Sequence, residues 1–581
     1  MTLLLLPLLL AACGPKVPPP AAAPPATAPA AAAPAAAAPP APAPLVYFAM
    51  VDRFANGDAT NDHAIDPADP HAFHGGDLQG VIDHLDHLER LGVTHLWLSP
   101  VFEMRTDKIG EWGAFHGYWV RDLARVEPRF GDEATLRALA DALHARDMKL
   151  VLDMVWNHTD YDAPLLRDHP DWFHDTGDII DWDDPTQRVT GRVHGLPDLA
   201  QERPAVARHL AATSTDWIDR VGVDGFRVDA VGHMPLSALA QLNARLDAHR
   251  PGFWTLGEDF TGDPERLSRT LREGAFDAVF DFPLRYAAID VFCHDAPLGR
   301  LASTLSLDRL YDDPTALVTF LDNHDLPRVT TECGGDAARV DRALAFLFSQ
   351  RGVPSLTWGT EVGLPGGEEP DNRRDQPWEA VSTPEGARRV AQVAGLTERR
   401  AAWPVLQHGN TVVLHLDADR LVLGRFTRTE AAVIDLSSPN APPAPPPPWL
   451  ASAPIRDSSL QLQTSASGTL RVQLLRVPGD APPPWADYLT APPAQRLVVT
   501  VPDGGEGLRL VGAGPELGHW DPSRGVPFVA ETASVELPGG TAAAFKVVRM
   551  TDAGVAWPDG PDTVTRLPWA AGETRVDAAA P

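Results

Sequence analysis

Three carboxylates and one arginine are the residues of this sequence whose types and positions could perform chemistry. Asp229, Glu258 and Asp325 each follow a short apolar run that is typical of a β-strand, and Arg227 precedes Asp229 by two residues. Side chains at positions i and i+2 of a strand share one face, so Arg227 and Asp229 should point together into the same site. A nearby cation lowers the pKa of a carboxylate, so Arg227 should keep Asp229 ionised.

The elements that must position these residues are short apolar runs that alternate with helical stretches. Eight such runs occur, at residues 46–54, 94–101, 149–158, 225–231, 253–259, 277–284, 317–325 and 354–361. Apolar residues at helical spacing, for example Leu136, Leu139, Ala140 and Leu143, occupy the segments between them. Eight strand and helix units predict a (β/α)8 barrel, a TIM barrel of the α/β class, with the active site at the C-terminal strand ends.

Polar side chains gather at four of these predicted strand ends. They are Asp153, Asn157 and His158 after the third, Arg227, Asp229 and His233 after the fourth, Glu258 after the fifth, and His324 and Asp325 after the seventh. A lone aspartate at a strand end is usually a cap or a solvated loop residue. Four strand ends that carry such residues together predict an active site.

The segments around these positions resemble the four signature regions of the α-amylase family, glycoside hydrolase family 13. The segments are 153–158 (DMVWNH), 225–233 (GFRVDAVGH), 256–259 (LGED) and 320–325 (FLDNHD). Residues 116–119 (HGYW), 196–199 (LPDL) and 352–361 (GVPSLTWGTE) are similar to shorter motifs of the same family. The resemblance covers residues 46–403 in the family's order.

The resemblance implies retaining glycoside hydrolysis with three carboxylates in defined roles. Asp229 matches the nucleophile, Glu258 the general acid and base, and Asp325 the carboxylate that stabilises the distorted sugar and the transition state. Retaining enzymes hold nucleophile and acid about 5 to 5.5 Å apart, which neighbouring strand ends can supply. Burial and nearby negative charge should keep Glu258 protonated. The implied substrate-binding residues are Arg227, His116, Tyr118, His158 and His324.

The resemblance also implies a structural calcium ion beside the cleft. Its ligands would be Asn157, Asp198 and the backbone carbonyl of His233, and hard cations prefer such oxygen donors. This ion would clamp a small inserted domain B, at about residues 159–197, to the barrel. The alternative is that Asn157 and Asp198 only satisfy loop backbone groups.

A second loop resembles the calcium loop of cyclodextrin glucanotransferases and related amylases. Its predicted Ca²⁺ ligands are Asn56, Asp58, Asn61, Asp62, the carbonyl of Gly75, and Asp77. The alternative is a solvated acidic turn, because Asn, Asp and Gly are ordinary turn formers.

After about residue 400 the sequence changes to short segments in which apolar and polar residues alternate, as is typical of β-strands. We expect the barrel domain to span residues 45–400, with one β-sandwich domain at 401–478 and a second at 490–575. Segments 510–522, 537–550 and 554–562 of the second resemble the starch-binding domain of carbohydrate-binding module family 20. Trp520, Lys546 and Trp557 match its main sugar site, where indole faces stack on glucose rings. Core packing is the alternative role for these tryptophans.

Two departures from the module's pattern predict weakened starch binding. A tryptophan that usually precedes the LP turn is missing before Leu537, and Asp562 and Thr563 stand where an Asn-Arg pair is common.

Composition narrows the possible partners. The 581 residues include 49 Lys and Arg against 78 Asp and Glu, a formal charge of −29, which repels phosphate backbones and excludes nucleic acid as the expected partner. The sequence contains no CxxC or HExxH pattern, so it gives no indication of thiol redox chemistry or of a zinc site. Cys293 and Cys333 are compatible with a disulfide or with two buried thiols. We expect a monomer.

The N-terminal region resembles a bacterial lipoprotein signal. Residues 1–12 form the expected signal peptide, cleaved before Cys13, which would carry the lipid; an ordinary secretory signal is the alternative. Residues 13–44 are rich in Ala and Pro and predict an extended tether. We therefore expect an exported protein, anchored to the outer membrane through this lipid and facing outward, or secreted.

These features predict an endo-acting α-amylase that hydrolyses α-1,4-glucosidic bonds in starch and maltodextrins. A cyclodextrin glucanotransferase, a maltogenic amylase and a neopullulanase-like enzyme stay open as alternatives, since residues 368–378 (EEPDNRRDQPW) resemble a stretch of several maltodextrin-degrading bacterial relatives. Residues 480–490 leave no room for the extra sandwich domain that glucanotransferases normally carry, which favours hydrolysis. A non-catalytic, surface-anchored starch receptor is the alternative from another class, and the complete set of three carboxylates argues against it.

Overall fold

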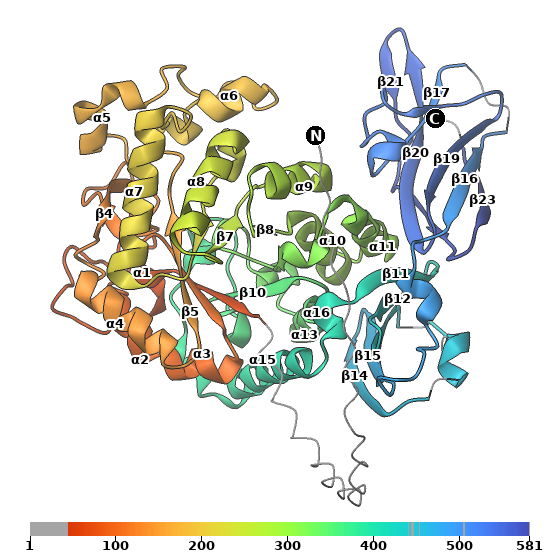
Figure 1. Ribbon diagram of the computed structural model, residues 1–581, viewed down its shortest axis with the longest axis horizontal. Coiled ribbons are helices and arrows are strands. Elements are labelled where there is room, and N and C mark those ends of the chain that lie inside the picture. Colours follow the sequence, from red (N-terminus) through yellow and green to blue (C-terminus); the bar gives the residue numbers. More distant parts are fainter. Residues whose placement is uncertain (1–43, 440, 443–446, 453, 503–505, 580) are drawn as a thin grey trace, which may run out of the picture. The chain divides into compact units, whose positions relative to one another are not determined.

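The computed structural model describes residues 44–439, 441–442, 447–452, 454–502, 506–579 and 581 (Figure 1). The predicted signal peptide, the lipidation residue Cys13 and nearly all of the predicted tether lie outside this range. Among the helices it does describe, none is long and apolar enough to cross a bilayer.

Eight strands among the described residues form a closed barrel in the order β1-β10-β9-β8-β7-β6-β5-β2. All eight neighbouring pairs are parallel. The strands are β1 (Val46–Ala49), β2 (His95–Leu98), β5 (Lys149–Met154), β6 (Gly225–Val228), β7 (Trp254–Gly257), β8 (Ala278–Phe280), β9 (Leu317–Thr319) and β10 (Val353–Thr357). Each overlaps one of the eight predicted runs, and the TIM-barrel prediction is confirmed.

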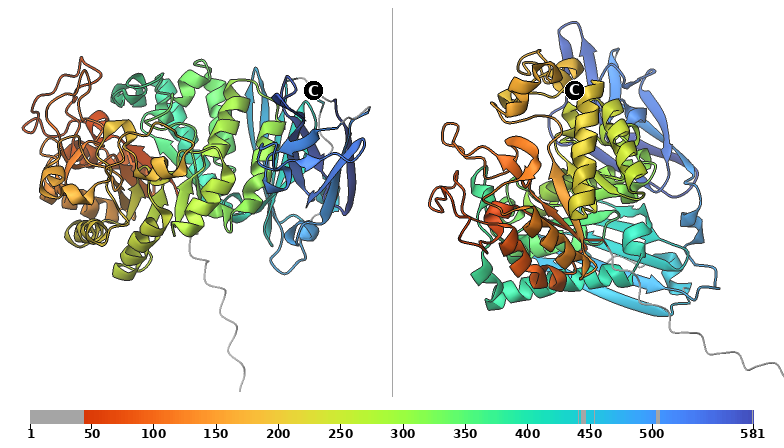
Figure 2. Two further views of the ribbon diagram at one scale, coloured as in Figure 1. Left: turned by 90° about the horizontal axis from the view of Figure 1, so that it is seen from above. Right: turned by 60° about the vertical axis from the view of Figure 1, so that its left-hand side comes forward.

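Helices surround these strands in the views of Figures 1 and 2. In α4 (Glu133–His144), the predicted apolar stripe of Leu136, Leu139, Ala140 and Leu143 is buried, and Asp132 caps the first turn. The other helices of this region are α1 (Val51–Phe54), α2 (Leu78–Asp83), α3 (Leu85–Leu91), α7 (Pro204–Val221), α8 (Leu236–His249), α9 (Pro264–Glu273), α10 (Phe282–Cys293), α11 (Gly299–Leu305), α12 (Val329–Glu332), α13 (Ala337–Leu347), α14 (Trp378–Val381), α15 (Pro384–Ala402) and α16 (Val405–His408).

Irregular segments rise from two places on the C-terminal side of the barrel. Between β2 and β5 lies a two-stranded sheet of β3 (Phe102–Met104) and β4 (Val120–Val126). Between β5 and α7 the chain forms only short helical pieces, α5 (Pro164–Asp168) and α6 (Pro185–Thr190), with two 3-10 turns. The predicted domain B falls in this second segment. Isolated bridges join His158 to Asp198 and Phe173 to Leu199, so both ends of the segment are held beside β5.

The first C-terminal region contains one antiparallel sheet in the residues that the structure describes. Its order is β11-β12-β13-β15-β14, with β11 (Asn410–Leu416), β12 (Arg420–Phe426), β13 (Glu430–Ser437), β14 (Asp457–Ser465) and β15 (Gly468–Arg476). The strands agree with the expectation, but the predicted β-sandwich would need two stacked sheets, and the described residues of this region form one. Alternation predicts strands and does not predict how many sheets they build.

The second C-terminal region has two sheets. One is β19-β16-β23, and the other is β18-β17-β20-β21 with β22 paired to β20. The strands are β16 (Ala494–Thr500), β17 (Leu508–Gly512), β18 (Val526–Pro527), β19 (Thr532–Pro538), β20 (Thr541–Thr551), β21 (Gly554–Ala556), β22 (Thr563–Leu567) and β23 (Gly572–Asp577). Leu497, Leu510, Phe545 and Leu567 belong to the buried core between them.

A disulfide joins Cys293, the last residue of α10, to Cys333, which follows α12. The sequence left this pairing open. The bond fastens the chain eight residues beyond Asp325.

Candidate active site

Arg227 on β6 contacts three carboxylates at the C-terminal end of the barrel. Its side chain is fully buried, and Nη1 donates to Oδ1 of Asp229 and to Oδ1 of Asp153, both at 2.8 Å. Nη2 lies 2.5 Å from Oε1 of Glu258. Asp229 and Glu258 directly follow β6 and β7, two adjacent strands, so barrel topology brings them to the same guanidinium.

Asp153 on β5 anchors this group from below. Besides Arg227, its Oδ2 accepts hydrogen bonds from Nε1 of Trp97 at 3.0 Å and from the hydroxyl of Tyr118 at 2.9 Å. The sequence identified Asp153 only as one of several strand-end residues and gave it no role. Three donor groups make four hydrogen bonds to this fully buried carboxylate, which fixes the orientation of Arg227 and hence of both carboxylates above it.

Glu258 has the properties of a proton donor. Burial raises its pKa to about 8, with Arg227 opposing the rise and the charges of Asp229, Asp325 and Asp153 adding to it. The backbone N–H of Ala230 lies 3.3 Å from Oε2. Glu258 is therefore protonated at neutral pH, while Asp229 keeps an ion-pair contact with Arg227.

Asp325 sits on the opposite wall of the site in an ionised form. Burial opposes its ionisation, but the guanidinium groups of Arg373 and Arg227 hold the pKa of Asp325 below its usual range. Nη2 of Arg373 lies 3.1 Å from its Oδ1. Burial lowers the pKa of His324 to about 3, so this imidazole is neutral.

The predicted substrate-binding residues line one cleft. The cavity has a volume of about 560 Å³ and is bordered by His116, Tyr118, His158, Asp229, Glu258, His324 and Asp325, with Arg227 buried beneath. The rings of Tyr118 and His324 are parallel within 5°, with centroids 5.2 Å apart. His158 donates from Nε2 to the carbonyl oxygen of Tyr118 at 3.1 Å. The structure thus brings together all eight residues that were expected to act on the sugar.

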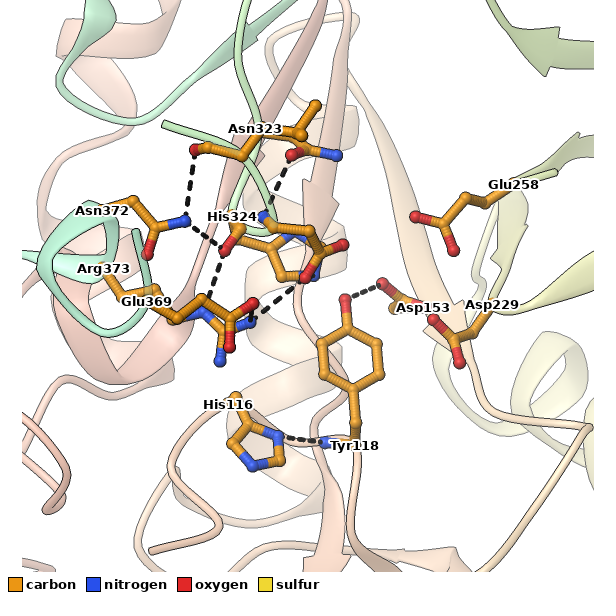
Figure 3. A network of polar contacts seen from close by, with 12 residues as sticks. His116, Tyr118, Asp153, Asp229, Glu258, Asn323, His324, Glu369, Asn372 and Arg373 are labelled. Atoms are coloured by element: carbon orange, nitrogen blue, oxygen red, sulfur yellow. Dashed lines mark hydrogen bonds and ion pairs between the residues drawn. The ribbon is translucent and has the colours of Figure 1, made fainter. Parts of the chain in front are cut away.

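The loop after β10 supplies cleft residues that the sequence reasoning missed. Arg373 donates from Nε to the backbone oxygen of His324 at 2.9 Å, and its Nη2 lies 2.5 Å from Oε1 of Glu369 (Figure 3). Asn372 donates to the same His324 oxygen at 2.8 Å. The segment 368–378 was noticed for its resemblance to relatives, but no local pattern indicates that it folds over the loop after β9.

The first predicted calcium set contains two buried oxygens without protein partners. Among the described residues, Oδ1 of Asn157 and Oδ1 of Asp198 make no hydrogen bond. Oδ2 of Asp198 lies 2.6 Å from Nδ1 of His174, and His233 donates from Nδ1 to the backbone oxygen of Arg188 at 3.0 Å. Orphaned amide and carboxylate oxygens beside the inserted segment fit a hard cation.

The second predicted calcium set is gathered into one loop cluster. Asn56 contacts both carboxylate oxygens of Asp62 at 2.9 Å, and Asp77 accepts from the backbone N–H of Asp58 at 2.8 Å. A Cβ on Gly75, whose φ is +94°, would lie 2.7 Å from Oδ1 of Asp62, so only glycine allows this approach. Oδ1 of Asn61 is buried without a partner within the described residues. In the same residues no three acidic, His or Cys side chains converge on one point, so a cation here would rely on amide and carbonyl oxygens too.

The predicted sugar-binding residues of the last domain lie on the paired strand β20 and in loops. Trp557, after β21, is 43% exposed, and Trp520 is partly exposed with a left-handed φ of +62°. Lys546 on β20 donates from Nζ to the backbone oxygen of Gly560 at 2.9 Å. Trp557 is therefore too exposed for a role in core packing, which was the alternative for these tryptophans.

The central arrangement can perform a two-step displacement on an acetal carbon. Asp229 lies in ion-pair contact with Arg227 and can attack, and Glu258, whose pKa burial raises to about 8, can donate a proton to a leaving oxygen. Their contacts to two nitrogens of one guanidinium hold the two carboxyl groups side by side, as a nucleophile and an acid of one displacement must be.

Comparison with known proteins gives matches along most of the chain. Residues 48–176 and 171–405 match the family described as "Alpha amylase, catalytic domain". A Paenibacillus polymyxa beta/alpha-amylase is 33% identical over 63% of this chain and 31% of its own length, and a Bacillus sp. cyclomaltodextrinase is 32% identical over 58% and 62%. The chain thus spans less than two thirds of either relative. A Klebsiella oxytoca cyclomaltodextrin glucanotransferase is 26% identical over 89% of this chain and 91% of its own.

A solved structure supports the same relationship. The Anoxybacillus α-amylase superposes with a TM-score of 0.64 at 31% identity, covering 89% of this chain and 98% of its own.

Proposed function

Because this chain belongs to the α-amylase family of glycoside hydrolases and transferases, we propose that it hydrolyses internal α-1,4-glucosidic bonds of starch and maltodextrins with retention of configuration. The observation that carries the proposal is the single guanidinium of Arg227 that contacts both Asp229 and Glu258. It pairs with Asp229 through Nη1 and contacts Glu258 through Nη2, and burial raises the pKa of Glu258 to about 8, which suits a proton donor.

In this mechanism Asp229 attacks the anomeric carbon while Glu258 protonates the departing glycosidic oxygen, and a glycosyl ester forms on Asp229. Glu258, now ionised, then removes a proton from water, which attacks the same carbon and releases Asp229. Asp325 and the neutral His324 bind the sugar at the reacting position, and Tyr118 offers a ring face to it.

The test is hydrolysis of soluble starch, measured as reducing ends. Asp229→Ala and Glu258→Gln should each lower the activity at least about a thousandfold, because one variant lacks the nucleophile and the other lacks the general acid. Asp219→Asn, an exposed carboxylate on α7, is the control and should keep full activity. Near-parental activity in either active-site variant would refute the assignment.

A cyclising glucanotransferase is the second candidate, and one observation favours it: the relative of that activity matches the chain over 89% of its length. The short connection between β15 and β16, residues 477–493, supports hydrolysis, because it leaves no room for an additional sandwich domain. Product analysis on starch, pullulan and cyclodextrin separates hydrolysis from cyclisation and α-1,6 cleavage.

We propose further that calcium ions stabilise the two oxygen-rich loop sites and that residues 490–575 bind starch. Support comes from the unpartnered oxygens of Asn157, Asp198 and Asn61 and from the exposed Trp557. A lipid on Cys13 would hold the enzyme on the outer face of the cell, where polymeric starch is found; the N-terminal sequence is its support. We also propose that the enzyme acts as a monomer.

A further inference from the structure

Arg266 on α9 forms a fixed pair with Asp259, the residue that follows Glu258. Nε of Arg266 lies 3.0 Å from Oδ2 of Asp259, and Nη2 lies 2.5 Å from Oδ1, so the contact is bidentate. The hydroxyl of Thr270, one turn further along α9, donates to Oδ2 at 2.8 Å. The side chain of Asp259 is 1% exposed and that of Arg266 is 20% exposed. The carboxylate is thus a buried anchor that orients the guanidinium.

Gly232 provides the space for this guanidinium. A Cβ at Gly232 would lie 2.3 Å from Nη2 of Arg266 and 2.6 Å from Oδ1 of Asp259. Any side chain at position 232 would therefore displace the arginine. Gly232, Asp259 and Arg266 all border the same cleft as Asp229 and Glu258.

One nitrogen of Arg266 is left for a ligand. Nε and Nη2 are engaged by Asp259, while Nη1 makes no hydrogen bond to any residue that the structure describes. It is also not among the buried polar atoms without partners, so it remains accessible. A guanidinium held in this way presents two N–H donors in a fixed direction, which suits neighbouring hydroxyl groups.

The position of the pair relates it to the departing half of the substrate. Glu258 lies across the site from Arg373 and Glu369 (Figure 3). The general acid protonates the oxygen that leaves, so the leaving sugar is expected in the part of the cleft that Glu258 and its neighbours line. Asp259 follows Glu258 in the chain, and the loop that carries it packs against α9.

We propose that Arg266, oriented by Asp259 and admitted by Gly232, binds hydroxyl groups of the glucose unit that leaves in the first step. This rests on the proposed function, because Glu258 must be the acid. Arg266 then contributes only when the leaving group is a sugar. An ion pair that merely fastens α9 to the barrel would act equally on every substrate.

The test compares two substrates with different leaving groups. Maltohexaose carries glucose units on the leaving side, whereas α-maltosyl fluoride releases only fluoride. In Arg266→Gln, kcat/KM for maltohexaose should fall about tenfold or more, the effect of a lost charged hydrogen bond, while kcat/KM for the fluoride should change less than about twofold. Gly232→Ala should give the same pattern by moving the intact arginine. The double variant Gly232→Ala/Arg266→Gln should lose no more than Arg266→Gln alone. Arg272→Gln, an exposed arginine on the same helix, is the matched control.

The outcomes separate the possibilities. Equal losses on both substrates would assign Arg266 a purely structural role and overturn the inference, as would an unchanged kcat/KM for maltohexaose or additive losses in the double variant. A parental enzyme that is inactive on both substrates would overturn the proposed function, and this inference with it.

Discussion

Arg227 and Glu258 are in direct contact, with Nη2 of the arginine 2.5 Å from Oε1 of the glutamate and both side chains almost completely buried. The same guanidinium contacts Asp229 through its other terminal nitrogen. One cation therefore sets the relative position of the two groups that must act together, and its own orientation depends on Asp153.

The alkaline limb of the pH profile should report Glu258. Burial raises the pKa of Glu258 to about 8, and the acid must be protonated to act, so kcat/KM for maltohexaose should fall as pH rises through about 8. The decline should be weaker for α-maltosyl fluoride, whose leaving group needs no proton. An alkaline midpoint near the ordinary pKa of a glutamate would contradict this environment.

Removal of the Tyr118 hydroxyl should test whether Asp153 fixes the position of Arg227. Tyr118→Phe keeps the ring that stacks on His324 but loses the hydrogen bond to Asp153. We expect kcat on maltohexaose to fall about tenfold with little change in KM, since a hydrogen bond to a charged group is lost. Tyr161→Phe, which loses a hydrogen bond to a backbone oxygen at the edge of the cleft, should change kcat less than about twofold. A Tyr118→Phe enzyme with parental kcat would argue against the anchor.

Chelation should destabilise the protein if the loop sites hold calcium. Treatment with EGTA should lower Tm, and added Ca²⁺ should restore it, because a ligand that binds only the folded state adds about 2.7 kcal/mol at one hundred times its Kd. Asp198→Asn and Asp62→Asn should each reduce both the bound calcium and the shift, whereas Asp219→Asn should not. An unchanged Tm together with no calcium by elemental analysis would remove both sites.

Starch binding should depend on Trp557 separately from catalysis. Trp557→Ala removes an exposed indole and should reduce retention on granular starch about tenfold or more, while hydrolysis of maltohexaose stays at the parental rate. Val529→Ala, a 76% exposed residue of the same domain, is the control. Undiminished retention would place the sugar site elsewhere.

The sequence predicts well the features that depend on local residue patterns, namely the barrel strands and the carboxylates that follow them. Each barrel strand is a short apolar run; Asp229 and Glu258 directly follow such strands, and Asp325 lies in the loop that follows β9. Asp153 lies on such a strand too, but its contacts with Trp97 and Tyr118 depend on the closure of the barrel.

Other residues reach the cleft through tertiary structure alone. Arg373 belongs to a loop after β10 that folds over His324, and Arg266 lies on a helix where an arginine ordinarily faces solvent. The need for glycine at position 232 follows only from the structure, where the Arg266 guanidinium occupies the space that a side chain at this position would take.

The anomeric form of the first product tests the central claim most directly. Proton NMR of maltohexaose during the first turnovers should show new reducing ends in the α form, which later equilibrate with the β form, because attack by Asp229 followed by water inverts the anomeric carbon twice. Initial release of the β form would mean a single displacement by water and would contradict the role of Asp229 as nucleophile.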